Sequence, residues 1–278
     1  MSQSSLIAPA IRALILAHYE RSAQYLVESF SLAPVVPTYY PNGLGHDAAY
    51  GGSWHHAIPH TVQSVDVGDP AHTHHYIALT SNALLWLVHR DAVGFESWTP
   101  SPLDPESVGY ARICLKPRGG ATQDQLSFAL LGLRTILLGW GVEAVPVLNG
   151  VDGATLFIPF SDVPSYDAVR TWLHEVASEA VTRNAALYTT DVHDHTSPRI
   201  HVDVSSNAVG HFSSLPYALI GTPQLGMVTP IHWNELGVVH NGQFNAGNSG
   251  ERLAQGNVFA EAAAPLAHQR FSDARRAR

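Results

Sequence analysis

Two side chains with acid–base and metal-binding chemistry lie two positions apart in the segment PRIHVDVSS. His201 and Asp203 fall on one predicted strand, and because alternate side chains of a strand point to the same face, both should emerge together. With His193 or His195 from the preceding HDHTS turn, they could bind Zn²⁺, Fe²⁺ or Mn²⁺. Alternatively, the pair works as acid and base without metal, or His201 is only hydrogen-bonded to Asp203 while the turn histidines are solvated.

Lys116 is the only lysine; the other 14 of the 15 basic residues are arginine. It lies in YARICLKP, a predicted buried strand that ends at Pro117, with Cys114 on the same strand face. A lysine in a cleft can lose its proton and act as a general base or a Schiff-base nucleophile, whereas an ion pair would leave it structural. Cys114 is either a small core residue or, beside an ammonium, a reactive thiolate.

Other histidines form clusters whose chemistry the sequence leaves open. In the tract HTHH, His72 and His74 alternate and could bind a metal on a strand, or the tract could be a polar edge or loop. A third cluster carries a weaker signal of the same kind: His55, His56 and His60.

The charge balance limits the partners. Lys and Arg number 15 against 23 Asp and Glu, a net charge of −8, so we expect sequence-independent binding to a phosphate backbone to be disfavoured. No apolar stretch approaches the length of a membrane span, and charged residues interrupt the N-terminal helical pattern, so we expect a cytoplasmic protein that contacts no membrane. The single cysteine excludes an internal disulfide framework.

Helices mixed with strands must position these side chains. Apolar spacing predicts a helix from the N-terminus to about Phe30, then short strands and turns over residues 34–75. Two further helices are predicted at DQLSFALLGLRTILLGWG and SYDAVRTWLHEVASEAVTRN, separated by a strand, a Gly-bearing turn and a strand. ALYTTDV and PRIHVDVSS are predicted to form a hairpin, and one short helix is expected around residues 249–268. This mixture indicates an α+β or mixed α/β fold.

Several segments share their order and spacing with a known family. The strongest is IHVDVSSNAVGHFSSLPYALIGTPQLGMVTPIHWNEL, and YYPNGLG, LLWLV and GFESW add support. The matching positions in the first segment are Asp203, Asn207, Pro216, Tyr217, Thr229, Pro230, Trp233, Glu235 and Leu236. Over nearly its whole length the chain thus resembles the polymerase domain of bacterial ligase D, of the archaeo-eukaryotic primase superfamily.

The resemblance implies one domain over residues 1–278, with a lobe of about 1–100 packed on a core lobe of about 101–278. It also implies an α+β fold, a mixed sheet with flanking helices and a cleft over the central sheet.

The resemblance further implies three aspartates that hold two divalent cations for nucleotidyl transfer, two of them separated by one residue on one strand. Here Cys114 and Lys116 stand in those two positions, and Asp203 stands in the third. If the strands pair as in the family, Lys116 faces Asp203. A lone carboxylate facing an ammonium cannot hold two Mg²⁺ ions, so we expect neither a two-magnesium site nor ordinary polymerisation.

The family's triphosphate-binding motif is also altered. LNGVDGAT keeps Gly150 and Gly153, but Asn149 stands for the family's serine and Thr155 for its histidine. The glycine amides could still bind an anion, or the segment could be an ordinary hairpin turn. Ile220 replaces an arginine, and the phosphate-binding lysines have no counterpart because the chain has a single lysine.

We therefore expect a primase-polymerase-like protein whose cleft binds a small, nucleotide-like molecule, as a binder or as an enzyme that uses Lys116, Asp203 and His201. The pocket would be lined by Asn149, Gly150, Gly153, Thr155 and Arg199. Two alternatives stay open: a non-catalytic DNA-repair or regulatory binding protein, and a DNA or RNA polymerase or primase with unusual ligands.

Overall fold

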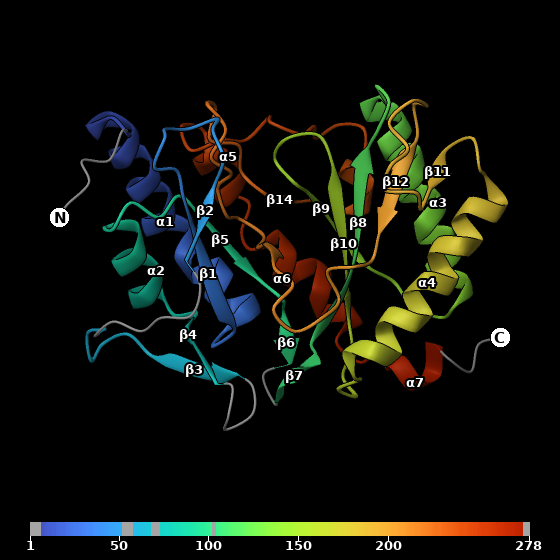
Figure 1. The fold of residues 1–278 in the computed structure, drawn as a ribbon, viewed down its shortest axis with the longest axis horizontal. Helices are drawn as coiled ribbons and strands as arrows, with labels where there is room; N and C mark the ends of the chain where they lie inside the picture. Colours follow the sequence, from blue (N-terminus) through green and yellow to red (C-terminus); the bar gives the residue numbers. More distant parts are fainter. Residues whose placement is uncertain (1–6, 52–57, 68–72, 102–103, 275–278) are drawn as a thin grey trace.

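The computed structural model describes residues 7–51, 58–67, 73–101 and 104–274. It confirms the expected α+β fold with flanking helices, and most strands belong to two six-stranded sheets rather than to one central sheet. The two sheets lie in opposite halves of the molecule, each with helices on its outer side (Figure 1). In the described part of the chain, no helix is both long and apolar enough to cross a bilayer.

The first sheet has the strand order β13-β5-β1-β4-β3, and β2 pairs with β1. Helix α1 (Pro9–Phe30) is tied to this sheet by the buried Tyr19, whose hydroxyl donates to the Val93 carbonyl at 2.8 Å. Helix α2 (Ser81–Val88) begins at Thr80, whose side chain accepts from the Ala83 amide. The strands are β1 (Pro34–Tyr39), β2 (Ala49–Tyr50), β3 (Ser64–Val67), β4 (His74–Ala78), β5 (Gly94–Ser97) and β13 (Ser213–Ser214).

The second sheet has the order β11-β12-β8-β10-β9-β14. Helices α3 (Gln123–Gly139) and α4 (Tyr166–Arg183) cover its outer side, and its other face is turned towards the first sheet (Figure 1). Its strands are β8 (Tyr110–Pro117), β9 (Val145–Leu148), β10 (Ala154–Pro159), β11 (Tyr188–Thr189), β12 (Ile200–Asp203) and β14 (Thr229–Pro230). A small two-stranded sheet, β6 (Pro100–Ser101) with β7 (Asp104–Val108), precedes β8.

The predicted hairpin over residues 186–206 is wrong, because β11 and β12 pair in parallel. The antiparallel partner of β12 is β8, from the distant part of the chain. Between β11 and β12 the chain turns back at Asp191, which accepts from the His193 amide, and is held by the ion pair of Asp194 with Arg199. Side-chain alternation predicts a strand but carries no information on its direction.

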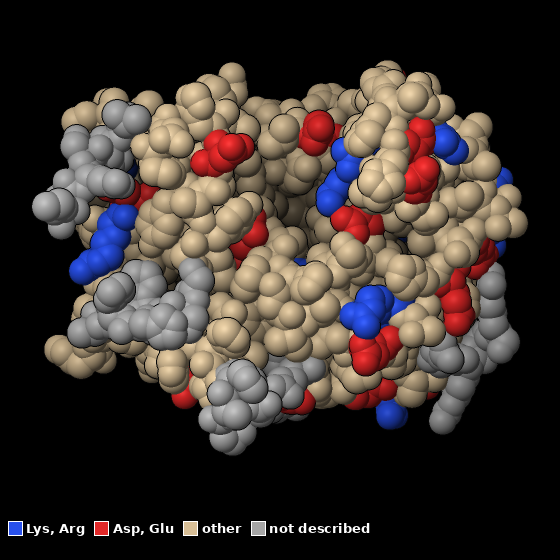
Figure 2. Space-filling view, viewed as in Figure 1, with Lys and Arg blue, Asp and Glu red and all other residues tan. Residues whose placement is uncertain are grey.

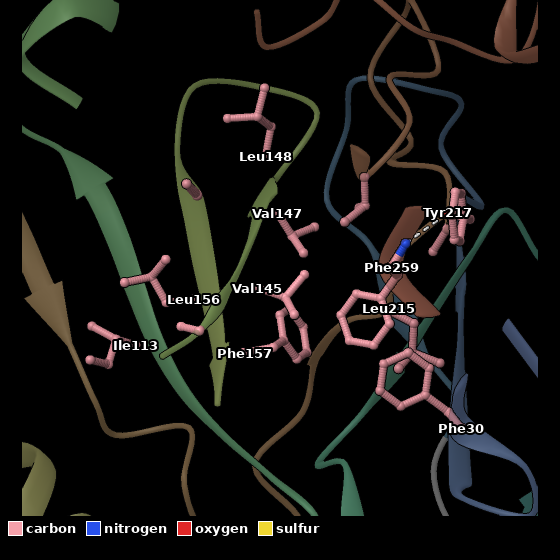
Figure 3. Close-up of a cluster of buried hydrophobic side chains, with 14 of the residues drawn as sticks. Phe30, Ile113, Val145, Val147, Leu148, Leu156, Phe157, Leu215, Tyr217 and Phe259 are labelled. Atoms are coloured by element: carbon pink, nitrogen blue, oxygen red, sulfur yellow. Dashed lines mark hydrogen bonds between the residues drawn. The ribbon is translucent and has the colours of Figure 1, made fainter. Parts of the chain in front are cut away.

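The C-terminal part contains several short helices where one was predicted: α5 (Ser249–Leu253), α6 (Val258–Ala263) and α7 (Phe271–Ala274), with 3₁₀ turns at Trp233–Glu235 and Ala264–Leu266. Helix α6 lies between the two sheets (Figure 1). Its Phe259 packs against Phe30 of α1 and Phe157 of β10, with ring centroids 5.0 and 5.4 Å away (Figure 3). The buried apolar residues form one cluster that includes members of both sheets, so this core fixes the sheets relative to one another.

Candidate functional site

A cavity of about 480 Å³ opens between the two sheets. Strands β8, β10 and β12 form one wall, and β5, β13 and the segment 205–214 form the other. Figure 2 shows a hollow near the centre of this face of the molecule. Its volume falls within the range of small-molecule sites.

The pairing of β12 with β8 gathers the reactive side chains on one face of the second sheet. His201 lies opposite Lys116, and Asp203 lies opposite Cys114. The Lys116 ammonium donates to Asp203 Oδ2 at 2.6 Å, as expected if the strands pair as in the family. The hydroxyl and amide of Ser205 donate to Asp203 Oδ1 at 2.6 and 2.9 Å. The Asp203 carboxylate therefore accepts three hydrogen bonds from within the protein, two at Oδ1 and one at Oδ2.

These contacts set the charge state of Asp203. Burial would raise its pKa, but the hydrogen bonds from Lys116 and Ser205 outweigh burial and lower the pKa to about 2. Asp203 is consequently a carboxylate at neutral pH, neutralised by an ammonium whose side chain is 47% exposed.

The residues at this place do not fit a pair of divalent cations. Hard cations such as Mg²⁺ take several oxygen ligands, but the wall offers one carboxylate bonded to an ammonium. Cys114 supplies a sulfur that lies 3.7 Å from the hydroxyls of both Ser206 and Thr155. Over residues 7–51, 58–67, 73–101 and 104–274, no group of three or more His, Cys, Asp or Glu could hold a metal ion.

The predicted histidine and carboxylate metal site is accordingly not assembled. His201 is buried beside β11 and does not line the cavity, and burial lowers its pKa although the charge of Asp203 opposes this. His193 and His195 are exposed in the connection between β11 and β12. The prediction assumed that the turn histidines reach the strand face of His201 and Asp203, but both lie in the connection that enters β12 at Ile200, the end of the strand opposite Asp203.

The NGVDG segment forms the turn between β9 and β10, and its amides are engaged inside the protein. Asn149 Oδ1 accepts from the amides of Val151, Asp152 and Gly153 at 2.9 to 3.0 Å. The Gly150 amide donates to Asn241 Oδ1 at 3.0 Å. The structure thus corresponds to the hairpin-turn interpretation, because these amides have no free N–H for an anion.

The two glycines of this turn are explained by its geometry. Gly150 has φ +82°, and a Cβ at Gly153 would lie 2.5 Å from the Leu115 carbonyl oxygen. Of the four predicted pocket residues in this segment, Asn149 and Thr155 line the cavity, and Gly150 and Gly153 do not.

Arg199 was also expected in the pocket, but the structure places it elsewhere. Its guanidinium pairs with Asp194 and donates to the Ala185 carbonyl oxygen at 3.3 Å. The side chain of Arg199 therefore lies beside Asp194 and Ala185, and it does not line the cavity.

The remaining histidine clusters take no part in the cavity. His74 and His75 are exposed on β4, where His75 Nδ1 lies 2.6 Å from Asp66 Oδ1, and His60 is exposed. His55, His56 and His72 lie outside the described residues.

Sequence reasoning missed two charged residues beside the cavity. Glu96 of β5 lines it directly, and its carboxylate accepts from the Ser214 hydroxyl at 3.5 Å. Arg112 of β8 is fully buried beneath it and donates to the carbonyl oxygens of Ser97 and His211 and to the Ser213 hydroxyl. A charged residue inside an otherwise apolar strand is the signal that could have identified both.

Comparisons with known proteins agree with this architecture. A family model described as LigD, primase-polymerase domain, matches residues 12–259. The polymerase domain of Mycobacterium tuberculosis Ligase D, solved in complex with DNA, superposes with a TM-score of 0.83 at 20% identity, covering 95% of this chain and 97% of that one.

Two curated proteins are similar in sequence. The multifunctional non-homologous end joining protein LigD of Mycolicibacterium smegmatis is 22% identical over 229 residues, 81% of this chain and 30% of that protein. The bifunctional non-homologous end joining protein LigD of Bacillus subtilis is 23% identical over 220 residues, 77% of this chain and 35% of that protein. The chain therefore spans about a third of the length of these relatives.

Proposed function

The chain belongs to the LigD primase-polymerase family, and we propose that it keeps this fold without two-metal nucleotidyl transfer, acting in the cytoplasm on a small, nucleotide-like molecule in the cleft. It would do so as a binder or as an enzyme that uses Lys116 and Asp203. The observation that carries this proposal is the 2.6 Å contact between the Lys116 ammonium and Asp203 Oδ2.

An ammonium is a reasonable replacement for a lost metal ion in this position. A carboxylate buried without a cation would be unfavourable, and Lys116 supplies the positive charge from the neighbouring strand. Because the ammonium is attached to the chain, a divalent cation would have to displace it and then find oxygen ligands that Cys114 and Lys116 do not provide.

A second candidate function is non-catalytic DNA binding. The structural neighbour from Mycobacterium tuberculosis was solved in complex with DNA, which favours this candidate. The net charge of −8 opposes it. In Figure 2 the described Lys and Arg residues are scattered around the hollow and form no continuous basic band across the face, which also opposes DNA binding.

The experiment is an assay of template-dependent dNTP and rNTP incorporation with Mn²⁺, on the full chain and on a variant that carries both Cys114→Asp and Lys116→Asp. We expect no incorporation by the wild type. We also expect the double variant to gain Mn²⁺ binding, measured by electron paramagnetic resonance, because three carboxylates would then face one another. Incorporation by the wild type that is lost in Asp203→Asn would instead identify a polymerase with unusual ligands.

Two further measurements separate the remaining candidates. Mobility shifts at low salt with single-stranded and end-bearing DNA test the DNA-binding candidate, and a retarded band that persists near physiological salt would favour it. Elemental analysis of untagged protein tests for zinc, iron or manganese, of which we expect no stoichiometric amount.

A further inference from the structure

The two carboxylates that line the cavity differ in their partners. Asp203 is bonded to Lys116 and Ser205. Glu96, on the opposite wall, accepts only the long 3.5 Å hydrogen bond from Ser214 and forms no ion pair with any residue of the described chain. One carboxylate of the cavity is therefore satisfied internally, and the other is available to a ligand.

Arg112, the cation whose charge acts on Glu96, already donates its hydrogen bonds to other acceptors. Arg112 is buried beside the cavity, and its two terminal nitrogens donate to Ser97, Ser213, Ser206 and His211. Its charge and the Ser214 hydrogen bond lower the pKa of Glu96, but burial, which raises this pKa, outweighs them. Because Ser214 offers it only a long hydrogen bond, the partly buried Glu96 carboxylate gains from a new hydrogen-bond donor.

An exposed aromatic ring shares the face of the sheet that carries Glu96. Val36 of β1 lies opposite Glu96, and Thr38, two residues on, lies opposite Tyr50 of β2, so all four side chains point to one side. Tyr50 is 60% exposed, and the charge of Glu96 is the main cause that raises its pKa. An exposed ring near a carboxylate is a combination that favours organic cations.

The charges on the walls disfavour a triphosphate. The charged side chains that line the cavity are Glu96, Asp203 and Lys116, and the last two neutralise each other. A polyanionic ligand would meet the unpaired Glu96 in a partly desolvated space, where like charges repel strongly.

We infer that Glu96 anchors a small organic cation, an amine or amidinium attached to a planar ring, and that this site excludes nucleoside triphosphates. The inference rests on the proposed function, because it narrows the small, nucleotide-like molecule of the same cleft to one with a planar, base-like ring, a cationic group and no triphosphate. The cationic group donates to Glu96 through charge-assisted hydrogen bonds, and the ring occupies the space between the two sheets.

The test compares three probes of nearly equal shape and different charge: benzamidine, benzamide and benzoate. Their dissociation constants are measured by ligand-observed NMR titration of the full chain, with metal-free ATP as a fourth probe. We expect benzamidine to bind at least about 10-fold more tightly than benzamide, which corresponds to about 1.4 kcal/mol of binding free energy. Benzoate and ATP should bind more weakly than benzamide.

The variant Glu96→Gln keeps the shape and removes the charge, so it should reduce the preference for benzamidine to about twofold or less. Glu251→Gln, on the exposed side of α5, is the matched control and should behave as the wild type. Glu96→Asp, which keeps the charge, should retain the preference and covers the case in which Glu96→Gln does not fold.

Three outcomes overturn the inference: equal affinity for benzamidine and benzamide, an unchanged preference in Glu96→Gln, or no binding of benzamidine. Each leaves the expected absence of nucleotidyl transfer untouched. Template-dependent incorporation, in contrast, overturns the proposed function whatever the probes show.

Discussion

Lys116 and Asp203 form an ion pair across the antiparallel pairing of β8 and β12, with the ammonium 2.6 Å from Oδ2. Asp203 is 16% exposed and Lys116 is 47% exposed, so the pair lies at the wall of the cavity with its cationic side towards solvent. The cleft thus holds its own positive charge at the place where the family resemblance implies metal ions.

Replacing Lys116 by Met removes the ammonium and keeps most of the stem. We expect the pKa of Asp203 to rise from about 2 towards its ordinary value of 3.8, because the first of its stabilising hydrogen bonds is lost. The loss of stability at pH 7 should be about 1 kcal/mol, since solvent screens the half-exposed pair.

A carboxyl NMR titration and urea unfolding measure these two effects, with Lys116→Arg as the charge-conserving control. The sign follows from the lowered pKa: the contribution of Asp203 is complete above pH 3.8 and is lost as the pH falls through about 2. An Asp203 titration that is the same in Lys116→Met and the wild type would contradict the role of the pair.

His18 should make the protein sensitive to mild acid. It is fully buried in α1, where Nε2 donates to the Tyr217 carbonyl oxygen and Nδ1 accepts from the Ser249 hydroxyl, both at 2.8 Å. Burial lowers its pKa from 6.5 to about 4. The unfolded chain therefore binds more protons between these values, and stability should fall by roughly 3 kcal/mol as the pH drops from 6.5 to 4.

Urea unfolding at pH 7.0, 5.5 and 4.5 measures this decrease. His18→Gln retains a donor and an acceptor but does not titrate, so the difference between the two pH curves isolates His18. Parallel curves for the wild type and His18→Gln would exclude it as the cause.

Arg112→Met should be strongly destabilising. Arg112 is fully buried, and its loss removes the donor from three carbonyl oxygens near the cavity, those of Ser97, Ser206 and His211. We expect a cost of about 3 kcal/mol, with Arg112→Lys intermediate because it keeps the charge but fewer donors. Urea unfolding gives the cost, and limited proteolysis should detect loosening of residues 205–214. A variant as stable as the wild type would show that these hydrogen bonds contribute little.

Asn149→Ala should loosen the turn between β9 and β10. The side-chain oxygen accepts from three successive amides, and alanine leaves them to water or unpaired. We expect the free energy of unfolding to fall by about 1 to 2 kcal/mol, measured by thermal or urea unfolding. Val151→Ala, in the same turn but 50% exposed, serves as the control and should change stability by less than about 0.5 kcal/mol. Equal effects of the two substitutions would refute the role assigned to Asn149.

The amino-acid sequence by itself determined most of the local structure. The helices α1, α3 and α4 and the strand β8 fall where apolar spacing and turn residues predict them. The alternation rule also placed Cys114 and Lys116 on one face, because side-chain direction in a strand depends only on neighbouring residues.

The tertiary structure decided which of these elements meet. The parallel pairing of β11 with β12, the displacement of Arg199 and the entry of Glu96 into the cavity all depend on contacts between distant parts of the chain. Such pairings are selected by the packing of a whole core, and a local pattern of residues specifies neither the direction of a strand nor its partner.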